Sequence, residues 1–383
     1  MKPAVGFDLS PLCWAPPSGI SYYAYHLAGG LEKLELPFLP YYFVFSHRPF
    51  ALDVPFPEPG RLKRAFLPIR AAKTVWDFGW GQKLLGLSNI DLFFATNSEL
   101  PALSKNQKKV MVLHDLSSFR LDGAYSGSFR ARRLDAVRQG LERSDRLVVY
   151  SRSTRTDLCE LFSYPEENCA IIPLGVDAEF FGRKIPERPF AHPYFFSNGM
   201  VQPRKNFVAL AGAFLLAVQE ADLPHHLLIA GGDGWKADEI KAEIHLLDKE
   251  NRVHFLGYVT RQKLAALYQH ADAFLFPSLY EGFGLPVLEA MAAGAPVLTS
   301  TTSSLPEVAG DAALLVNPNE ETAIKEGILR LAADRELSDR FRQRGKKRAS
   351  EFSFTQTAQK TADLIAGLLG AGTTVSKTQR GDS

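Results

Sequence analysis

The sequence is poor in several features that would assign a function quickly. Its three cysteines among 383 residues are too few and too scattered for a disulfide framework or a zinc site. No apolar run approaches the ~20 residues that a membrane-spanning helix needs. The first residues form no long apolar segment, so we expect no secretory signal and a cytoplasmic location.

Further absences exclude classes of ligand and chemistry. The formal net charge is only +2, which gives no reason to expect a nucleic-acid partner. No G-x-G-x-x-G follows the first predicted strand, which argues against a nicotinamide enzyme. No two aspartates are separated by a single residue, and the nine histidines show no ligand spacing. We therefore expect neither a metal ion nor a cofactor.

The chain does contain a regular alternation of short apolar runs and amphipathic segments. Because 383 residues are too many for one hydrophobic core, two domains are expected. The alternation predicts an α/β fold with parallel sheets covered on both faces. Strands are expected in the first half at 4–8, 41–45, 91–95, 109–113, 147–150 and 169–172. Strands are expected in the second half at 194–197, 226–230, 253–255, 273–276, 296–299 and 313–316.

The pattern is interrupted once, by a segment with four prolines among polar residues, which is typical of a linker. The predicted parts are a first domain (1–172), a linker (173–193), a second domain (194–352), a helix (about 355–369) and a disordered tail (370–383). Ligands of open α/β sheets bind beyond the carboxyl ends of the strands. Two such domains should therefore meet at a cleft.

The most specific segment is PSLYEGFGLPVLEAMA at 277–292, directly after an apolar strand. Gly282 and Gly284 keep Cβ atoms out of the turn, so backbone N–H groups can approach a ligand closely. The residues that follow predict a helix, whose N-terminus favours anions. The segment therefore predicts a diphosphate site, with Glu281 in the turn and Glu289 in the helix on either side of it.

This segment resembles the E-x7-E signature of retaining glycosyltransferases of family 4, and the resemblance covers nearly the whole chain, most strongly 195–318. It implies the GT-B fold, in which two Rossmann-like domains face a central cleft and the last helix returns to the first domain. It implies transfer of a sugar from a nucleotide-diphosphate donor, bound mainly by the second domain. It further implies that Glu281 contacts the donor sugar and that Glu289 holds the ribose.

Two shorter segments are similar to the same family. GMVQPRKN at 199–206 resembles the stretch whose basic residues, Arg204 and Lys205 here, hold the diphosphate. SGISYY at 18–23 resembles a loop that faces the phosphates from the opposite wall, where Gly19 would allow a close approach. Taken alone, the first segment also fits an ordinary basic turn and the second an ordinary helix start.

MVLHDL at 111–116 ends an apolar strand with His114 and Asp115. The family has a similar pair at its catalytic cleft, where the histidine contacts the donor sugar. Asp115 is either a general base for the acceptor or a loop or helix cap. The predicted catalytic residues are Glu281, His114 and Asp115; the predicted diphosphate-binding residues are Arg204, Lys205, Gly19, Gly282, Phe283, Gly284 and Leu285; and Glu289 is predicted to bind the nucleoside.

The motifs look most like those of bacterial mannosyltransferases of surface-polysaccharide assembly, so GDP-mannose ranks first as donor. UDP-glucose, UDP-GlcNAc and other UDP-sugars are the alternatives. Retention proceeds either by double displacement through a carboxylate or by front-face attack, which the resemblance favours. A GT-B epimerase or phosphorylase, and a catalytically silent nucleotide-sugar binding subunit, are the other functions that remain open.

The expected acceptor is a glycan or a lipid-linked sugar. Residues 61–73 hold five basic side chains and no acid, and Arg130, Arg132, Arg133 and Arg138 form a second basic group. One interpretation is an ordinary solvated surface. The other is peripheral docking on anionic lipid at the inner face of the membrane.

Overall fold

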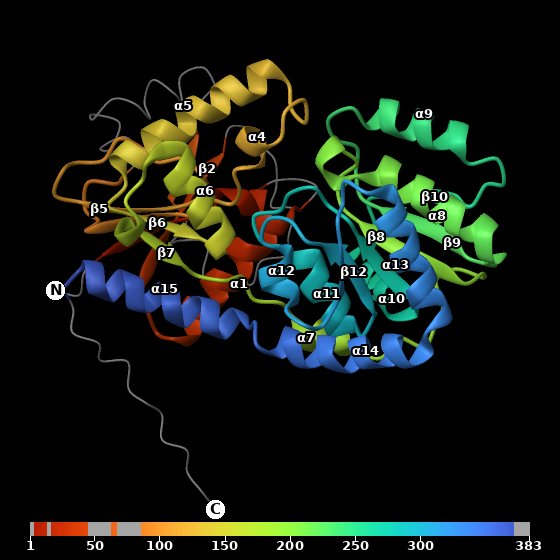
Figure 1. Ribbon diagram of the computed structural model, residues 1–383. Coiled ribbons are helices and arrows are strands. Elements are labelled where there is room, and N and C mark those ends of the chain that lie inside the picture. Colours follow the sequence, from red (N-terminus) through yellow and green to blue (C-terminus); the bar gives the residue numbers. More distant parts are fainter. Residues whose placement is uncertain (1–3, 14–16, 45–62, 67–85, 371–383) are drawn as a thin grey trace, which may run out of the picture.

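The computed structural model describes residues 4–13, 17–44, 63–66 and 86–370, and within them it contains two parallel sheets (Figure 1). The first sheet has the order β3-β2-β1-β4-β5-β6-β7 and the second β10-β9-β8-β11-β12-β13. The first comprises β1 (Val5–Asp8), β2 (Phe38–Val44), β3 (Lys63–Phe66), β4 (Leu92–Ala95), β5 (Lys108–Val112), β6 (Arg146–Val149) and β7 (Cys169–Ile171). The second comprises β8 (Tyr194–Asn198), β9 (His226–Ala230), β10 (Val253–Gly257), β11 (Ala273–Phe276), β12 (Val297–Ser300) and β13 (Leu314–Val316). The α/β class with two parallel sheets is confirmed, and β3 is a strand that the sequence did not predict.

Helices connect the strands, and many begin at a side chain that caps the first turn, such as Ser18, Ser151 and Thr260. The helices of the first half are α1 (Gly19–Lys33), α4 (Ser117–Arg120), α5 (Gly127–Arg143) and α6 (Arg152–Phe162). Those that follow are α7 (Ala178–Gly182), α8 (Phe207–Ala221), α9 (Ala237–Leu247), α10 (Arg261–His270), α11 (Leu285–Ala293), α12 (Leu305–Ala309), α13 (Glu321–Ala333), α14 (Arg335–Ser350) and α15 (Phe354–Leu368). In the part of the chain that is described, no helix is long and apolar enough to cross a membrane.

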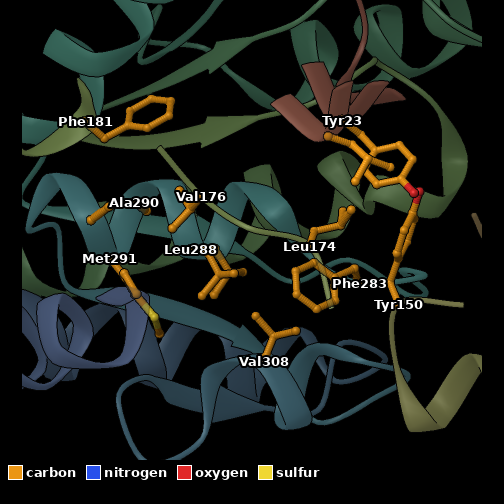
Figure 2. Close-up of a cluster of buried hydrophobic side chains, with 14 of the residues drawn as sticks. Tyr23, Tyr150, Leu174, Val176, Phe181, Phe283, Leu288, Ala290, Met291 and Val308 are labelled. Carbon is orange, nitrogen blue, oxygen red and sulfur yellow. The ribbon is translucent and has the colours of Figure 1, made fainter. Parts of the chain in front are cut away.

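The hydrophobic core is continuous between the two halves. Strands such as β1, β4 and β11 are buried at every residue, as expected for strands covered on both faces. One cluster of buried side chains joins Tyr23 and Tyr150 of the first half to Phe283 and Leu288 of the second (Figure 2). The two sheets are therefore held against each other by apolar contact as well as by the chain that connects them.

The chain passes between the halves twice, and the two crossings touch. Helix α14 runs along the second half, and α15 then returns to pack against α1 (Figure 1). The Val176 N–H donates to the Phe352 carbonyl at 3.0 Å. Gly175 lies so close to the second crossing that an added Cβ would be 2.1 Å from the Phe354 nitrogen. The segment expected as a linker, 173–193, contains α7, and the tail at 371–383 lies outside the described residues.

Candidate active site

The loop between β11 and α11 is shaped by glycine and proline. Gly284 has φ +109°, a left-handed conformation that suits glycine, and it directly precedes the first residue of α11. Pro286 stands in the first turn, where its missing N–H costs nothing. The helix ends at Gly294, which has φ +85°. The sequence therefore places the N-terminus of α11 directly after Glu281–Gly284.

Glu281 is buried in this loop and is held by two cations. Arg204 Nη1 lies 2.7 Å from its Oε2, and Lys205 Nζ lies 2.6 Å from its Oε1. Ser278 Oγ donates to the same Oε1 at 2.7 Å, and the Glu281 N–H donates to Ser303 Oγ at 3.0 Å. Every polar atom of the glutamate side chain thus has a partner that fixes its direction.

The electrostatics of this cluster keep Glu281 ionised. Burial alone would raise the pKa of its carboxyl, but Arg204 and Lys205 outweigh burial and lower that pKa to about 2. Burial lowers the pKa of the Lys205 ammonium to about 8, against the opposing effect of Glu281. The three side chains together carry one excess positive charge, which favours an anionic ligand. The Asp115 carboxylate is also near Arg204, and it helps to raise the pKa of that guanidinium.

Arg204 and Lys205 come from the turn after β8. Residues Pro203–Lys205 form one turn of 3-10 helix. Arg204 Nη1 also donates to the Tyr280 carbonyl at 3.1 Å, and Lys205 Nζ lies 4.5 Å from the centre of the Phe276 ring. Because β8 and β11 are neighbours in the sheet, the loops after them meet at its carboxyl edge. The structure therefore brings the two predicted cations to the predicted glutamate.

Backbone N–H groups at the start of α11 are free to bind a ligand. Among the described residues, no acceptor is present for the N–H groups of Gly282, Phe283, Gly284 and Leu285. The carbonyl oxygens of Glu281 and Phe283 face Ser304 instead, whose Oγ lies 2.8 Å from each and shares its single proton between them. The N-terminus of α11 is thus a ready anion site beside the two cations.

Glu289 has a separate environment one turn further along α11. Tyr268 Oη of α10 donates to its Oε2 at 3.0 Å, and Asn198 Nδ2 donates to the Tyr268 hydroxyl at 3.1 Å. Burial raises the pKa of Glu289 to about 7, while the Tyr268 hydrogen bond and Arg261 oppose that shift. The two glutamates share no hydrogen-bond partner, so their environments differ although both lie in one loop-helix unit.

His114 and Asp115 reach the same loop from the other half of the protein. His114 Nδ1 lies 2.8 Å from Tyr150 Oη, and its Nε2 is buried without a hydrogen-bond partner among the described residues. Burial, assisted by Arg133, lowers the pKa of the imidazole to about 4, so the ring is neutral at pH 7. Asp115 Oδ1 accepts from the N–H and hydroxyl of Ser117, at 3.1 and 2.7 Å, and so shapes the turn into α4.

The two halves approach each other closely at Gly282. A Cβ added there would lie 1.9 Å from the His114 carbonyl oxygen and 2.8 Å from Asp115 Cβ. Gly19 is different, since no atom lies within 4 Å of a Cβ added at the start of α1. Tyr22, one turn further along α1, interacts electrostatically with Glu289, so this helix faces the nucleoside side of the predicted site.

Several polar partners were not predicted as site residues. Tyr150 contacts His114, and a tyrosine at the end of an apolar run gives no sequence signal for such a role. Tyr268, which contacts Glu289, lies inside the part of the chain that the family resemblance covers. Ser278 and Ser303 lie inside segments that the family resemblance covers, so their position was a usable signal. Among the described residues, no three histidine, cysteine or acidic side chains come together as a metal site.

Comparison with known proteins places the chain in a family. The family model for glycosyl transferases group 1 matches residues 139–348, and that for glycosyltransferase family 4 matches 17–180. O-antigen chain mannosyltransferase B of Escherichia coli is 31% identical over 279 residues, which are 70% of this chain and 72% of that protein.

Solved structures of low sequence identity share the fold. Sucrose-phosphate synthase from Thermosynechococcus elongatus superimposes with a TM-score of 0.76 at 21% identity, over 97% of this chain and 100% of that one. The Anabaena protein HepE, in complex with UDP and glucose, has a TM-score of 0.72 at 18% identity, over 95% and 99%. The two matching family models and the mannosyltransferase relative together show that the chain belongs to the group 1 and family 4 glycosyltransferases, enzymes of the GT-B fold.

Proposed function

We propose that the chain transfers a sugar from a nucleoside diphosphate to a hydroxyl of a glycan or lipid-linked acceptor, with retention and without a metal ion. The observation that carries this proposal is that Arg204 and Lys205 both pair with Glu281 and that the N–H groups of 282–285, which follow it directly in the chain, have no acceptor among the described residues. Fixed cations and a helix N-terminus stabilise the charge that develops on a departing diphosphate.

Each residue then has a distinct task. Glu281 stabilises the positive charge that develops on the sugar ring as the glycosidic bond breaks. Glu289 accepts hydrogen bonds from the ribose hydroxyls, and neutral His114 contacts the donor sugar, the role that the family resemblance implies. The diphosphate is bound by Arg204, Lys205, Gly282, Phe283, Gly284 and Leu285, with Gly19 on the opposite wall. The second half of the chain thus binds the donor, and the first half binds the acceptor.

Retention is proposed to occur by front-face attack. The C1–O bond to the diphosphate breaks, the acceptor oxygen bonds to C1 on the same face, and the acceptor proton passes to the departing phosphate oxygen. The Glu281 carboxylate is held by Arg204 and Lys205, which suits it to electrostatic stabilisation better than to nucleophilic attack. Asp115 is engaged by Ser117, so we assign it to the shape of the turn before α4.

The donor proposed first is GDP-mannose, because the Escherichia coli relative is a mannosyltransferase. A UDP-sugar is the second candidate, because the Anabaena protein of the same fold was solved with UDP and glucose. The test is turnover with a panel of sugar nucleotides in excess EDTA. We expect GDP-mannose to react fastest and chelation to change nothing, since protein cations neutralise the diphosphate. Rescue by Mn²⁺ would contradict the metal-free site, and binding without turnover of any donor would indicate a silent subunit.

Nucleoside binding should depend on pH through Glu289. Its pKa of about 7 lies above the ordinary value, so the carboxylate is lost as the pH falls through 7 and is present above it. A hydrogen bond to a charged group contributes ~1.5–3 kcal/mol, and with a pKa of about 7 the ionised fraction of Glu289 falls about tenfold between pH 8 and 6, so Kd for the nucleoside diphosphate should rise about five- to tenfold over that range. Calorimetry over this range measures the change.

The matched control for this pH dependence is Glu289→Gln, which has no carboxyl to titrate. Its Kd should resemble that of the wild type at pH 6 and should change over the same range only as far as the ligand phosphate titrates, with a pKa near ~6. Equal pH dependence in both proteins would remove Glu289 from the nucleoside site.

Peripheral membrane docking is proposed from the basic surface of α5. Arg130, Arg132 and Arg138 are exposed on this helix, and Phe129 is 42% exposed, whereas Arg133 is partly buried and donates to Ser98 Oγ at 3.1 Å. Of the basic stretch 61–73, the residues 61–62 and 67–73 lie outside the described residues.

If α5 docks on an anionic membrane, the protein should co-sediment with anionic vesicles at low salt. Each basic side chain near such a surface contributes ~1 kcal/mol, so replacing Arg130, Arg132 and Arg138 together by glutamine should weaken binding at least ~100-fold. Neutral vesicles are the control. Equal binding of the wild type and the triple variant, or no binding of either, would contradict a role for α5.

A further inference from the structure

The loop that holds Glu281 is also held by the opposite half of the protein. Tyr280, the residue before Glu281, points its hydroxyl at α6 and donates to Asp157 Oδ2 at 2.5 Å. The other oxygen, Asp157 Oδ1, lies 2.6 Å from Arg120 Nη2, and Arg120 also pairs with Glu160. This hydrogen bond joins residues 123 positions apart and crosses between the two halves.

Helix α6 makes a second attachment on the other side of Glu281. The hydroxyls of Ser151 and Thr154 donate to the Gly282 carbonyl oxygen at 2.9 and 3.1 Å, and both residues are fully buried. Ser151, Thr154 and Asp157 are spaced by three residues and therefore lie along one face of the first two turns of α6. That face holds the loop immediately before and immediately after Glu281.

The same attachment extends to Arg204. Its Nη1 donates to the Tyr280 carbonyl at 3.1 Å, and its own carbonyl accepts from the Leu279 N–H at 2.9 Å. A displacement of Tyr280 would therefore move both Glu281 and the cation proposed to bind the diphosphate. Burial and the nearby Asp157 carboxylate hold the pKa of Tyr280 well above its usual range, so the phenol stays protonated and remains a donor.

We propose that Asp157, through Tyr280, is a positioning residue for the reaction: it sets Glu281 and Arg204 in the catalytic arrangement only while the two halves are in contact through α6. This inference rests on the proposed roles of Glu281 and Arg204. Asp157 touches neither residue directly, so its effect is expected on the chemical step and on the order of the loop, with little effect on nucleoside binding.

The test compares Tyr280→Phe, Asp157→Asn and the double variant. Tyr280→Phe removes a single hydroxyl and leaves the Asp157–Arg120 pair intact, so it should fold normally. We expect kcat to fall ~10–100-fold in Tyr280→Phe with Kd for the nucleoside diphosphate unchanged within about twofold. Asp157→Asn retains a neutral acceptor and should lose less. The loss of kcat in the double variant should be smaller than the sum of the two single losses, because both changes act on the Tyr280–Asp157 hydrogen bond and only Asp157→Asn also weakens the Asp157–Arg120 pair.

The control is Glu160→Gln, which disturbs the exposed second partner of Arg120 and leaves the Tyr280–Asp157 bond in place. It should retain the kcat of the wild type. A second readout is hydrogen exchange of the backbone amides of Leu279 and Glu281, which are hydrogen-bonded to the Arg204 carbonyl and to Ser303 Oγ; it should accelerate in Tyr280→Phe and remain slow in Glu160→Gln. This measurement requires no turnover.

The outcomes separate the two hypotheses. Wild-type protein that turns over no sugar nucleotide would refute the proposed function, while the exchange rates would still decide whether α6 orders the loop. Unchanged exchange and unchanged kcat in Tyr280→Phe would overturn the positioning role. A lower melting temperature with unchanged kcat would also overturn it, because the contact would then stabilise the fold alone. Additive losses in the double variant would show that Tyr280 and Asp157 act independently.

Discussion

Replacing Glu281 by glutamine is expected to lower kcat by ~10²–10³-fold, the range found when one preorganised electrostatic contact to a transition state is removed. Glutamine preserves the shape of the side chain but removes the negative charge that Arg204 and Lys205 keep in place at neutral pH. The loss should appear in kcat, because the positive charge on the sugar exists mainly in the transition state.

The same change should strengthen binding of the free nucleoside diphosphate, by about tenfold. In the structure the carboxylate occupies both cations, at 2.7 and 2.6 Å, and it would also repel an incoming phosphate. Calorimetry of the nucleoside diphosphate, together with kcat from the donor assay, measures both effects. Weaker nucleotide binding by Glu281→Gln would show that the carboxylate contacts the nucleotide itself, and undiminished turnover would remove Glu281 from the chemistry.

Glu281→Gln should also destabilise the protein. Removing one partner of a buried ion pair leaves the other charge uncompensated and typically costs ~3–5 kcal/mol. Bound diphosphate supplies the missing negative charge, so a saturating nucleoside diphosphate should raise the melting temperature of the variant more than that of the wild type. Ser278→Ala is a suitable comparison, because it removes one hydrogen bond to the same oxygen and leaves both cations paired.

Replacing Gly282 by alanine is expected to be the most damaging single-methyl change in the site. The added Cβ would lie 1.9 Å from the His114 carbonyl oxygen, a distance that forces the backbone of one half to move. Overpacking usually costs ~1–3 kcal/mol and occasionally more. A displacement of about 1 Å at a catalytic group can reduce the rate ~100-fold, and this loop carries Glu281.

A glycine elsewhere provides the matched control. Gly29 lies within α1, and no atom lies within 4 Å of a Cβ added there. Gly29→Ala should therefore leave kcat unchanged and raise stability by up to ~1 kcal/mol, since alanine is the better helix former. Thermal unfolding and donor turnover, measured for Gly282→Ala and Gly29→Ala, test these expectations. If Gly282→Ala keeps full activity and stability, Gly282 is not in close contact with the His114 backbone.

The sequence predicted the alternation of elements better than their exact number. Runs such as AFLF in β11 are apolar throughout and mark a strand buried on both faces. By contrast, the KRAF of β3 begins with two cations and has no such run. Helix α6 was not predicted either, because its first six residues, RSTRTD, are all polar and only its second half carries apolar side chains.

The site could be located from spacing and resemblance, but its contacts could not. Glu281 and Glu289 stand in one short segment, so a single strand, turn and helix place both. Lys205 and Glu281 are 76 residues apart, and their ion pair depends on β8 lying beside β11 in the sheet. Two further strands, β9 and β10, lie between β8 and β11 in the chain. Local sequence pattern does not reveal that β11 pairs with β8 instead of with β10.

The return of α15 to the first half has a consequence for synthesis on the ribosome. Residues such as Ala358 and Ile365 of α15 are buried, and a Cβ added to Gly30 of α1 would lie 2.6 Å from the Ala358 Cβ. At ~5–20 residues per second, translation needs roughly 10–40 s to proceed from Ile171 at the end of β7 to Phe354. During that time the nascent first half exposes the apolar surface of α1, so its folding is completed only after the second half has been made.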